Sequence, residues 1–381
     1  MGPTAAVKLG IAPRPENLKI NGSQTLDDRF NDRKSASACK NTYNNIYFQP
    51  MQIHPPYLLF LGDAADQLAA KTANGIAMWR PDWCLGQLRL PNCNADLGLP
   101  DMSLEQGRQS GARTLIVGVA NRGGIISDLW LQTLLEALDL GYDIASGLHN
   151  RLGASPQLGE RAAAKGLQLF DVRYPTQEFN IGSGKKRSGK RLLTVGTDCS
   201  VGKMFTTLAI EREMRSRNMP ADFRATGQTG IFIAGSGVSV DAVVADFIAG
   251  ATEDLAPDND PDHWDLIEGQ GSLFHASYAG VSLGLLHGAQ ADRLILCHEP
   301  TRQHMRGLPD YPLPSLADCI QANEQAGRLT NPDCRVAGLS INTSALDATE
   351  AQELLHQTKA RIGLPTVDAY RFGAGPLVDV L

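Results

Sequence analysis

Length, composition and charge limit the class of protein. The chain has 381 residues, of which 43% are hydrophobic and 20% are charged, and 38 are glycine. This is the composition of a globular protein with room for two α/β domains. The formal net charge of −6 excludes a generally basic surface, so the sequence predicts neither a nucleic-acid partner nor binding to anionic lipid.

Membrane and disulfide-rich classes are also disfavoured. The longest apolar stretch without charge, residues 272–291, is interrupted by histidines, serines and glycines, which a bilayer core tolerates poorly. The seven cysteines are odd in number and form no CxxC pair. We therefore expect a reduced, cytoplasmic protein with no transmembrane helix and no zinc site.

Residues 1–50 differ from the rest of the chain. They are polar, show no sustained hydrophobic period and carry more basic than acidic residues. This composition predicts disorder. We interpret the segment as a non-native or upstream-translated extension that precedes Met51.

Residues 51–175 alternate short apolar runs with longer amphipathic ones, which predicts a Rossmann-like domain with a parallel sheet. One helix is expected at Ile126–Leu138, where leucines recur on one helical face. The expected strands are Tyr57–Leu61, Thr114–Val119, Asp143–Ala145 and Gln168–Val172.

Residues 176–189 contain interleaved glycine, lysine and arginine residues, which predicts a flexible linker. From residue 190 to 381 the α/β rhythm resumes, with the acidic stretch Glu253–Asp262 expected to be a surface loop. Strands are expected at Leu192–Val195, Asp222–Thr226, Trp264–Ile267, Arg293–Cys297 and Arg335–Ser340.

The motif GTDCSVGKM lies between a predicted strand and a helix expected at about 202–217, where a phosphate-binding P-loop belongs. In such a loop the backbone amides and the helix N-terminus surround a phosphate, and Lys203 adds a positive charge. The second domain is therefore predicted to be a P-loop domain. The expected cofactor-binding residues are Gly196, Thr197, Asp198, Cys199, Ser200, Val201, Gly202, Lys203 and Met204.

Two departures from the usual GxxxxGK[ST] pattern change the expected chemistry. The first glycine is Gly196, one position before the usual spacing, and Met204 stands where a serine or threonine normally coordinates Mg²⁺. A thioether is a poor ligand for this hard ion. The loop is thus expected to hold a phosphate better than it cleaves one.

At this point the chain resembles known families. The loop is similar to the GTDTxVGKT loop of dethiobiotin synthetases, and from Met51 to Leu381 the sequence resembles the D-glutamate N-acetyltransferases. The matching stretches are the loop itself, GVANRGGIISDLW (118–130), TGQTGIFIAGSGVSVDAVVADFIAGATE (226–253), IEGQGSLFHASYAGVSLGLLHGAQAD (267–292) and CHEPTRQHMRG (297–307).

The resemblance implies transfer of an acetyl group from acetyl-CoA to the amine of D-glutamate, in D-amino-acid catabolism. Coenzyme A carries several phosphates, so a loop that binds phosphate without hydrolysing it suits an acyl-CoA enzyme. Acetyl-CoA is then a co-substrate, and no metal is required. The sequence does not determine the oligomeric state, and a homo-oligomer is one possible state.

Candidate catalytic residues are Glu268, His275 and Asp198. Glu268 follows a predicted strand, at the sheet edge where ligands bind, and Glu268 or His275 can accept the proton of the attacking amine. Either residue can instead be structural. Cys199, near a helix N-terminus, leaves an acyl-cysteine route open as an alternative to direct transfer.

Arginine is the natural partner of the two carboxylates of D-glutamate. Arg122, Arg302 and Arg306 lie on predicted ligand-facing loops and are the expected substrate-binding residues. We expect the active site in a cleft between the two domains. The alternatives are an ATP-dependent ligase or kinase like dethiobiotin synthetase, and a non-catalytic nucleotide-binding regulator.

Overall fold

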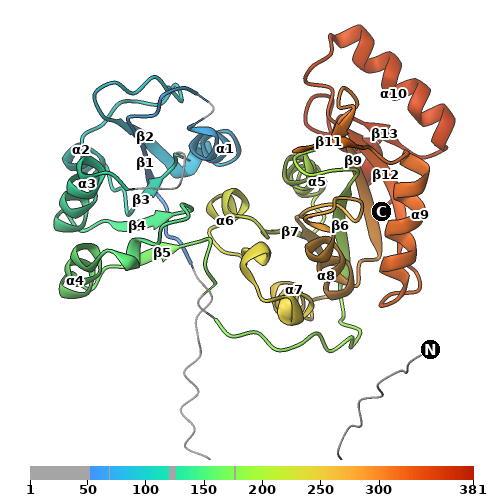
Figure 1. The fold of residues 1–381 in the computed structure, drawn as a ribbon, viewed down its shortest axis with the longest axis horizontal. Helices are drawn as coiled ribbons and strands as arrows, with labels where there is room; N and C mark the ends of the chain where they lie inside the picture. The colour runs from blue at the N-terminus through green and yellow to red at the C-terminus, as the bar shows by residue number, and fades with distance from the viewer. Residues whose placement is uncertain (1–51, 68, 120–125, 176) are drawn as a thin grey trace, which may run out of the picture. The chain divides into compact units, whose positions relative to one another are not determined.

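A computed structural model describes residues 52–67, 69–119, 126–175 and 177–381 (Figure 1). These residues all fall within one compact unit, Phe48–Leu381. Within the part of the chain so described, no helix is long and apolar enough to cross a membrane. Residues 1–50, predicted to be an extension, and Arg122 lie outside the described residues.

The first sheet has five parallel strands in the order β2-β1-β3-β4-β5. Strand β1 lies inside the sheet between β2 and β3, and its sequence YLLFLG is buried along its whole length because helices cover both faces. The strands are β1 Tyr57–Gly62, β2 Cys84–Arg89, β3 Thr114–Val117, β4 Asp143–Ser146 and β5 Leu169–Asp171.

The helices of this half lie on both faces of the sheet, with α1 on one side and α2, α3 and α4 on the other (Figure 1). The predicted helix at 126–138 starts two residues later, because the Ser127 side chain accepts a hydrogen bond from the Trp130 amide and so caps it. The helices are α1 Lys71–Trp79, α2 Leu104–Gln109, α3 Asp128–Asp139 and α4 Pro156–Lys165, with short 3₁₀ turns at Pro81–Trp83 and Leu152–Ala154.

The second sheet has six parallel strands in the order β13-β12-β9-β6-β8-β7. The strand before the P-loop, β6, lies inside the sheet between β8 and β9. The strands are β6 Lys190–Gly196, β7 Ala221–Arg224, β8 Trp264–Ile267, β9 Arg293–His298, β12 Arg335–Ile341 and β13 Thr366–Val367, and a separate hairpin pairs β10 His304–Met305 with β11 Leu308–Pro312.

Helices again cover both faces of this sheet. Helix α5 contacts α11 beside the sheet, whereas α8 packs against both α7 and α9. The helices are α5 Lys203–Ser216, α6 Gln228–Ala234, α7 Ile248–Leu255, α8 Ala279–Ala289, α9 Leu316–Arg328, α10 Ala348–Ile362 and α11 Gly375–Val378, with 3₁₀ turns at Val240–Ala242 and Ala245–Phe247.

The predicted fold class, a Rossmann-like α/β half followed by a P-loop half with a parallel sheet, is confirmed. Two local expectations need correction. Helix α7 continues to Leu255, so the predicted loop 253–262 is helical at its start. Part of the segment predicted as a flexible linker is anchored, because the buried Arg187 donates to the carbonyls of Glu253 and Ala289.

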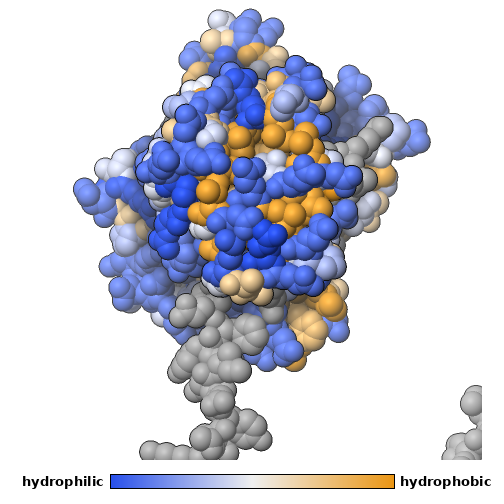
Figure 2. Space-filling view, turned by 90° about the vertical axis from the view of Figure 1, so that its left-hand side faces the viewer, coloured by the Kyte–Doolittle hydropathy of each residue, from blue (hydrophilic) through white to orange (hydrophobic). Residues whose placement is uncertain are grey.

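Apolar residues gather on one side of the molecule. Figure 2 views the side on which α3 and α4 lie in Figure 1 and shows apolar residues within a hydrophilic surround. On α3, Leu129 is 48% exposed. The opposite face of α3 packs against the sheet through Trp130, Leu134 and Leu138, so the helix is apolar on more than its core-facing side.

Candidate active site

The P-loop joins β6 to α5. The chain turns sharply here, because Ser200 and Gly202 both have left-handed backbone conformations, with φ of 54° and 97°. No side chain caps the N-terminus of α5. The amides of its first turn are therefore free to bind an anion, and the helix dipole favours negative charge at the same point.

Lys203, the first residue of α5, lies with its side chain under this loop. Its Nζ donates to the carbonyl oxygens of Asp198 (2.9 Å) and Gly271 (2.8 Å), and burial lowers the pKa of the amine. Both partners are neutral carbonyls. An arriving phosphate would therefore give this cation a directly bonded anionic partner.

Asp198 is fully buried and ties the P-loop to the segment that follows β9. Its Oδ1 accepts from the Cys199 amide (2.6 Å), and its Oδ2 accepts from Arg302 Nη1 (2.6 Å) and the Arg306 amide (2.8 Å). Arg302 also donates to the Cys199 carbonyl (2.7 Å). The guanidinium predicted to bind substrate is thus engaged in holding the loop.

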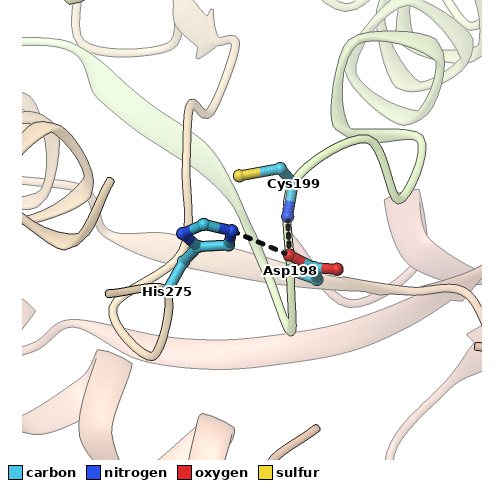
Figure 3. Close-up of side chains that lie close together, drawn as sticks. All are labelled: Asp198, Cys199 and His275. Atoms are coloured by element: carbon cyan, nitrogen blue, oxygen red, sulfur yellow. Dashed lines mark hydrogen bonds and ion pairs between the residues drawn. The ribbon is translucent and has the colours of Figure 1, made fainter. Parts of the chain in front are cut away.

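His275 lies beside Asp198 and Cys199 (Figure 3). Its Nδ1 accepts from the Ser277 amide (3.1 Å), so Nε2 carries the proton and donates to the Arg306 carbonyl (3.0 Å). Asp198 Oδ1 is 4.0 Å from the same Nε2. Both ring nitrogens therefore have partners within the protein, which supports a structural role for His275.

One donor atom from each of Asp198, Cys199 and His275 lies within 4.8 Å of the other two, a spacing at which three side chains could bind one metal ion. Arg302 already balances the charge of Asp198, and the protonated Nε2 of His275 faces a carbonyl. Burial raises the pKa of the Cys199 thiol. The donor set suits a hydrogen-bonded network better than metal ligation, and the thiol is poorly activated as a nucleophile.

Glu268 follows β8 at the carboxyl edge of the second sheet and is 4% exposed. Its Oε2 accepts from the amides of Thr226 (2.9 Å) and Gly227 (3.1 Å), which precede α6. Burial raises the pKa of this carboxyl to about 7, against the opposing effects of the two amides and of Lys203. Near neutral pH the group can both accept and release a proton.

A cavity of about 1230 Å³ lies over these groups. Among the predicted residues, the loop from Cys199 to Met204, Glu268 and Arg306 line it. Asp198, His275 and Arg302 lie beneath the loop and support it, and Gly196 and Thr197 do not reach the cavity.

Two of the predicted loop residues, Thr197 and Met204, have distinct environments. Thr197 is buried, and its hydroxyl lies 3.0 Å from His298 Nδ1 at the end of the neighbouring strand β9. Met204 lines the cavity and also packs against the hydrophobic core. The thioether therefore occupies a position between core and ligand space, where a P-loop NTPase would present a hydroxyl.

Several charged lining residues were missed by the sequence analysis. On the first half these are Lys71, His149 and Arg173, and on the second they include Asp368 and Arg371. His149 and Arg173 follow β4 and β5. The rule that ligands bind at the carboxyl ends of parallel strands could therefore have identified them from the sequence. Arg371 is bound to carbonyls of Thr343 (3.1 Å) and Leu346 (3.0 Å), and no local motif marks it.

Comparison with known proteins follows the same division into halves. Residues 180–378 match the domain of unknown function DUF1611_C, described as a P-loop domain, and residues 89–175 match DUF1611_N, described as a Rossmann-like domain. The chain is 31% identical to a DUF1611 family protein from Anabaena variabilis of known crystal structure, with a TM-score of 0.75, over 86% of this chain and 99% of that one.

Two relatives carry functional names. A D-glutamate N-acetyltransferase of Tritonibacter scottomollicae is 58% identical over 329 residues, which is 86% of this chain and 99% of the relative. A D-glutamate N-acetyltransferase of a Pseudoalteromonas species is 48% identical over 328 residues, with the same coverage of both chains.

Proposed function

The chain belongs to the family of D-glutamate N-acetyltransferases, and from that membership we propose that it is an acyltransferase that acetylates the amine of D-glutamate with acetyl-CoA. The products are N-acetyl-D-glutamate and free coenzyme A. We place the reaction in the cytoplasm, in the catabolism of D-amino acids. One observation carries the donor assignment: the P-loop and the proton-accepting Glu268 line one cavity.

The P-loop is proposed to bind a phosphate of coenzyme A at a distance from the thioester. The uncapped N-terminus of α5 and the Lys203 amine supply the positive field, and Arg306 lines the same space. Met204 supports this division of labour, because a phosphate that is only held needs no Mg²⁺ hydroxyl ligand beside it.

Glu268 is the proposed general base. The amine of D-glutamate attacks the thioester carbonyl, the new N–C bond forms, and the amine proton passes to the Glu268 carboxylate. The C–S bond then breaks, and the carboxyl returns the proton to the departing thiolate. A pKa of about 7 suits both transfers, since the group is close to half protonated at neutral pH.

The decisive test is release of free thiol from acetyl-CoA in the presence of each glutamate enantiomer. We expect steady thiol release with D-glutamate and at least tenfold slower release with L-glutamate, and N-acetylglutamate should form in equal amount. Absence of thiol release with both enantiomers would overturn the acetyltransferase assignment.

The same protein should also be given Mg²⁺, ATP and D-glutamate without acetyl-CoA. Formation of ADP under these conditions would favour the ligase or kinase alternative. Tight binding of a nucleotide with no turnover in either assay would favour the regulator.

A further inference from the structure

The carboxyl edges of both sheets contribute to one cavity. His149 and Arg173 follow the neighbouring strands β4 and β5 of the first sheet, and Glu268 follows β8 of the second. In parallel α/β sheets, loops at this edge bind ligands. The first half therefore supplies part of the substrate site as well as its own hydrophobic core.

Among these residues Arg173 has the geometry of a carboxylate ligand. Its side chain is 25% exposed, and among the described residues its Nη2 forms an ion pair with Asp241 at 3.3 Å. Asp241 is itself held by the Ser239 hydroxyl (2.9 Å). A single lateral partner of this kind orients the guanidinium and leaves donors for a second, bidentate carboxylate.

Short contacts connect this position to the proposed base. Glu268 accepts from the Thr226 amide, the Val240 amide donates to the Thr226 carbonyl (3.1 Å), and Val240 precedes Asp241. Arg173 and Glu268 thus line the same cavity and are linked through the segment from Thr226 to Asp241. We place the substrate amine at Glu268 and direct its far end, which in glutamate is the side-chain carboxylate, toward Arg173.

The first half contributes two cationic side chains to the cavity. These are Lys71 and Arg173, and Asp241 is the acidic residue paired with Arg173. By contrast, Arg302 is taken up by Asp198 and the loop carbonyls.

We propose that Arg173 binds the side-chain carboxylate of the amino-acid substrate and so determines the preference for glutamate, with Lys71 adding positive charge. This inference rests on the proposed function. It assigns recognition of the acceptor to the Rossmann-like half and recognition of the acyl donor to the P-loop half.

The test compares D-glutamate with D-glutamine, which lacks the side-chain charge, in wild-type enzyme and in Arg173→Gln. In the variant, KM for D-glutamate should rise about ten- to a hundredfold, the size of a lost charge-assisted contact. KM for D-glutamine and for acetyl-CoA should stay within about twofold, because their contacts do not include this charge pair. Arg173→Lys should recover part of the loss, since it restores the charge without the fork.

Arg151→Gln is the matched control. Arg151 follows the neighbouring strand β4 and stacks on the Tyr174 ring at 4.1 Å, but it does not line the cavity. It should leave both KM values unchanged. Equal effects of Arg173→Gln on D-glutamate and D-glutamine, or no effect on either, would overturn the assignment.

A wild-type enzyme without turnover would count against the proposed function and not against Arg173. In that case calorimetric binding of D-glutamate decides. Arg173→Gln should weaken binding by the same factor, and wild-type protein that binds no D-glutamate would overturn the inference.

Discussion

Glu268 combines two requirements that usually conflict. A buried carboxylate is costly unless it is paired, and the two backbone amides before α6 reduce that cost. They do not remove it, because the net pKa is still raised to about 7. The residual cost is what makes the group useful, since an acid with an ordinary pKa would be a weak proton acceptor at neutral pH.

Glu268→Gln should lower kcat by about a hundredfold or more, the usual contribution of a general base, with KM for acetyl-CoA nearly unchanged. In wild-type enzyme the rate should fall as pH decreases through about 7, because protonation removes the accepting form of the carboxylate. The variant should show no such step. Thiol release measured from pH 5.5 to 8.5 checks both points.

Glu253→Gln provides the control for this change. Glu253 also accepts two backbone amides, those of Ser183 (2.8 Å) and Gly184 (3.0 Å), but it does not line the cavity. It should keep the wild-type rate and the wild-type pH dependence. A step at pH 7 that persists in Glu268→Gln would identify another group as the base.

The sequence predicted individual site residues unevenly. Lys203 and Glu268, which both line the cavity, could be proposed from the sequence because each follows a buried strand in a known kind of turn, which is local information. The role of Arg302 in holding the loop was not predicted, because its partner Asp198 is 104 residues away in the sequence. Only the tertiary fold brings the two side chains together. A long-range ion pair leaves no periodic pattern in the sequence.

The elements that hold the P-loop were predicted to within two residues at each end. The buried run before Gly196 and the helix after it gave β6 and α5, because apolar strands and a strand–turn–helix motif are strong local signals. Strand β2 was missed. Its sequence CLGQLR has no apolar run, it lies at the sheet edge, and its buried Gln87 is stabilised by Asp96 (2.8 Å).

The P-loop as an element should contribute binding rather than chemistry. Lys203→Ala should raise KM for acetyl-CoA about ten- to a hundredfold, with a smaller change in kcat, because it removes a charge that contacts a phosphate remote from the thioester. Calorimetric titration with free coenzyme A should give the same loss of affinity.

Lys190→Ala, at the opposite end of β6, tests whether any loss of lysine at this strand has the same effect. Its side chain is 45% exposed and lies over the Trp264 ring, outside the cavity. It should bind coenzyme A normally. Loss of turnover in Lys203→Ala with coenzyme A affinity intact would instead place the loop at the reacting centre and favour phosphoryl transfer.

At the scale of the whole molecule, the site depends on close contact between the edges of the two sheets. Helix α1 of the first half packs on α6 of the second, and Arg80 at the end of α1 pairs with Glu211 of α5 (3.3 Å). Trp79 adds an edge contact with Phe205 of α5. We infer that these contacts fix the position of the first half, and with it His149 and Arg173, relative to the groups that the other half supplies.

A close approach between the two halves occurs at Gly147, directly after β4. A Cβ at this position would lie 2.4 Å from Gln228 Oε1 and 3.3 Å from Gln228 Cβ, at the start of α6. Glycine is therefore required by close approach rather than by a special backbone angle. A methyl group here must turn the Gln228 side chain away from its present position, and the remaining contact with Gln228 Cβ requires α6 or the loop that carries His149 to shift by a few tenths of an ångström.

Gly147→Ala should accordingly raise KM for D-glutamate several-fold and lower kcat, with little effect on KM for acetyl-CoA, because the P-loop lies on the other side of Glu268. Gly153→Ala is the matched control: its Cβ would meet only Asp171 Oδ2, at an ordinary 3.7 Å, and it should behave like wild type. Both variants restrict the unfolded chain equally, so a difference between them reports the contact itself. Steady-state kinetics in both substrates would measure these effects, with thermal unfolding to verify that each variant is folded. Wild-type KM for D-glutamate and wild-type kcat in Gly147→Ala would contradict a site that both sheets contribute to.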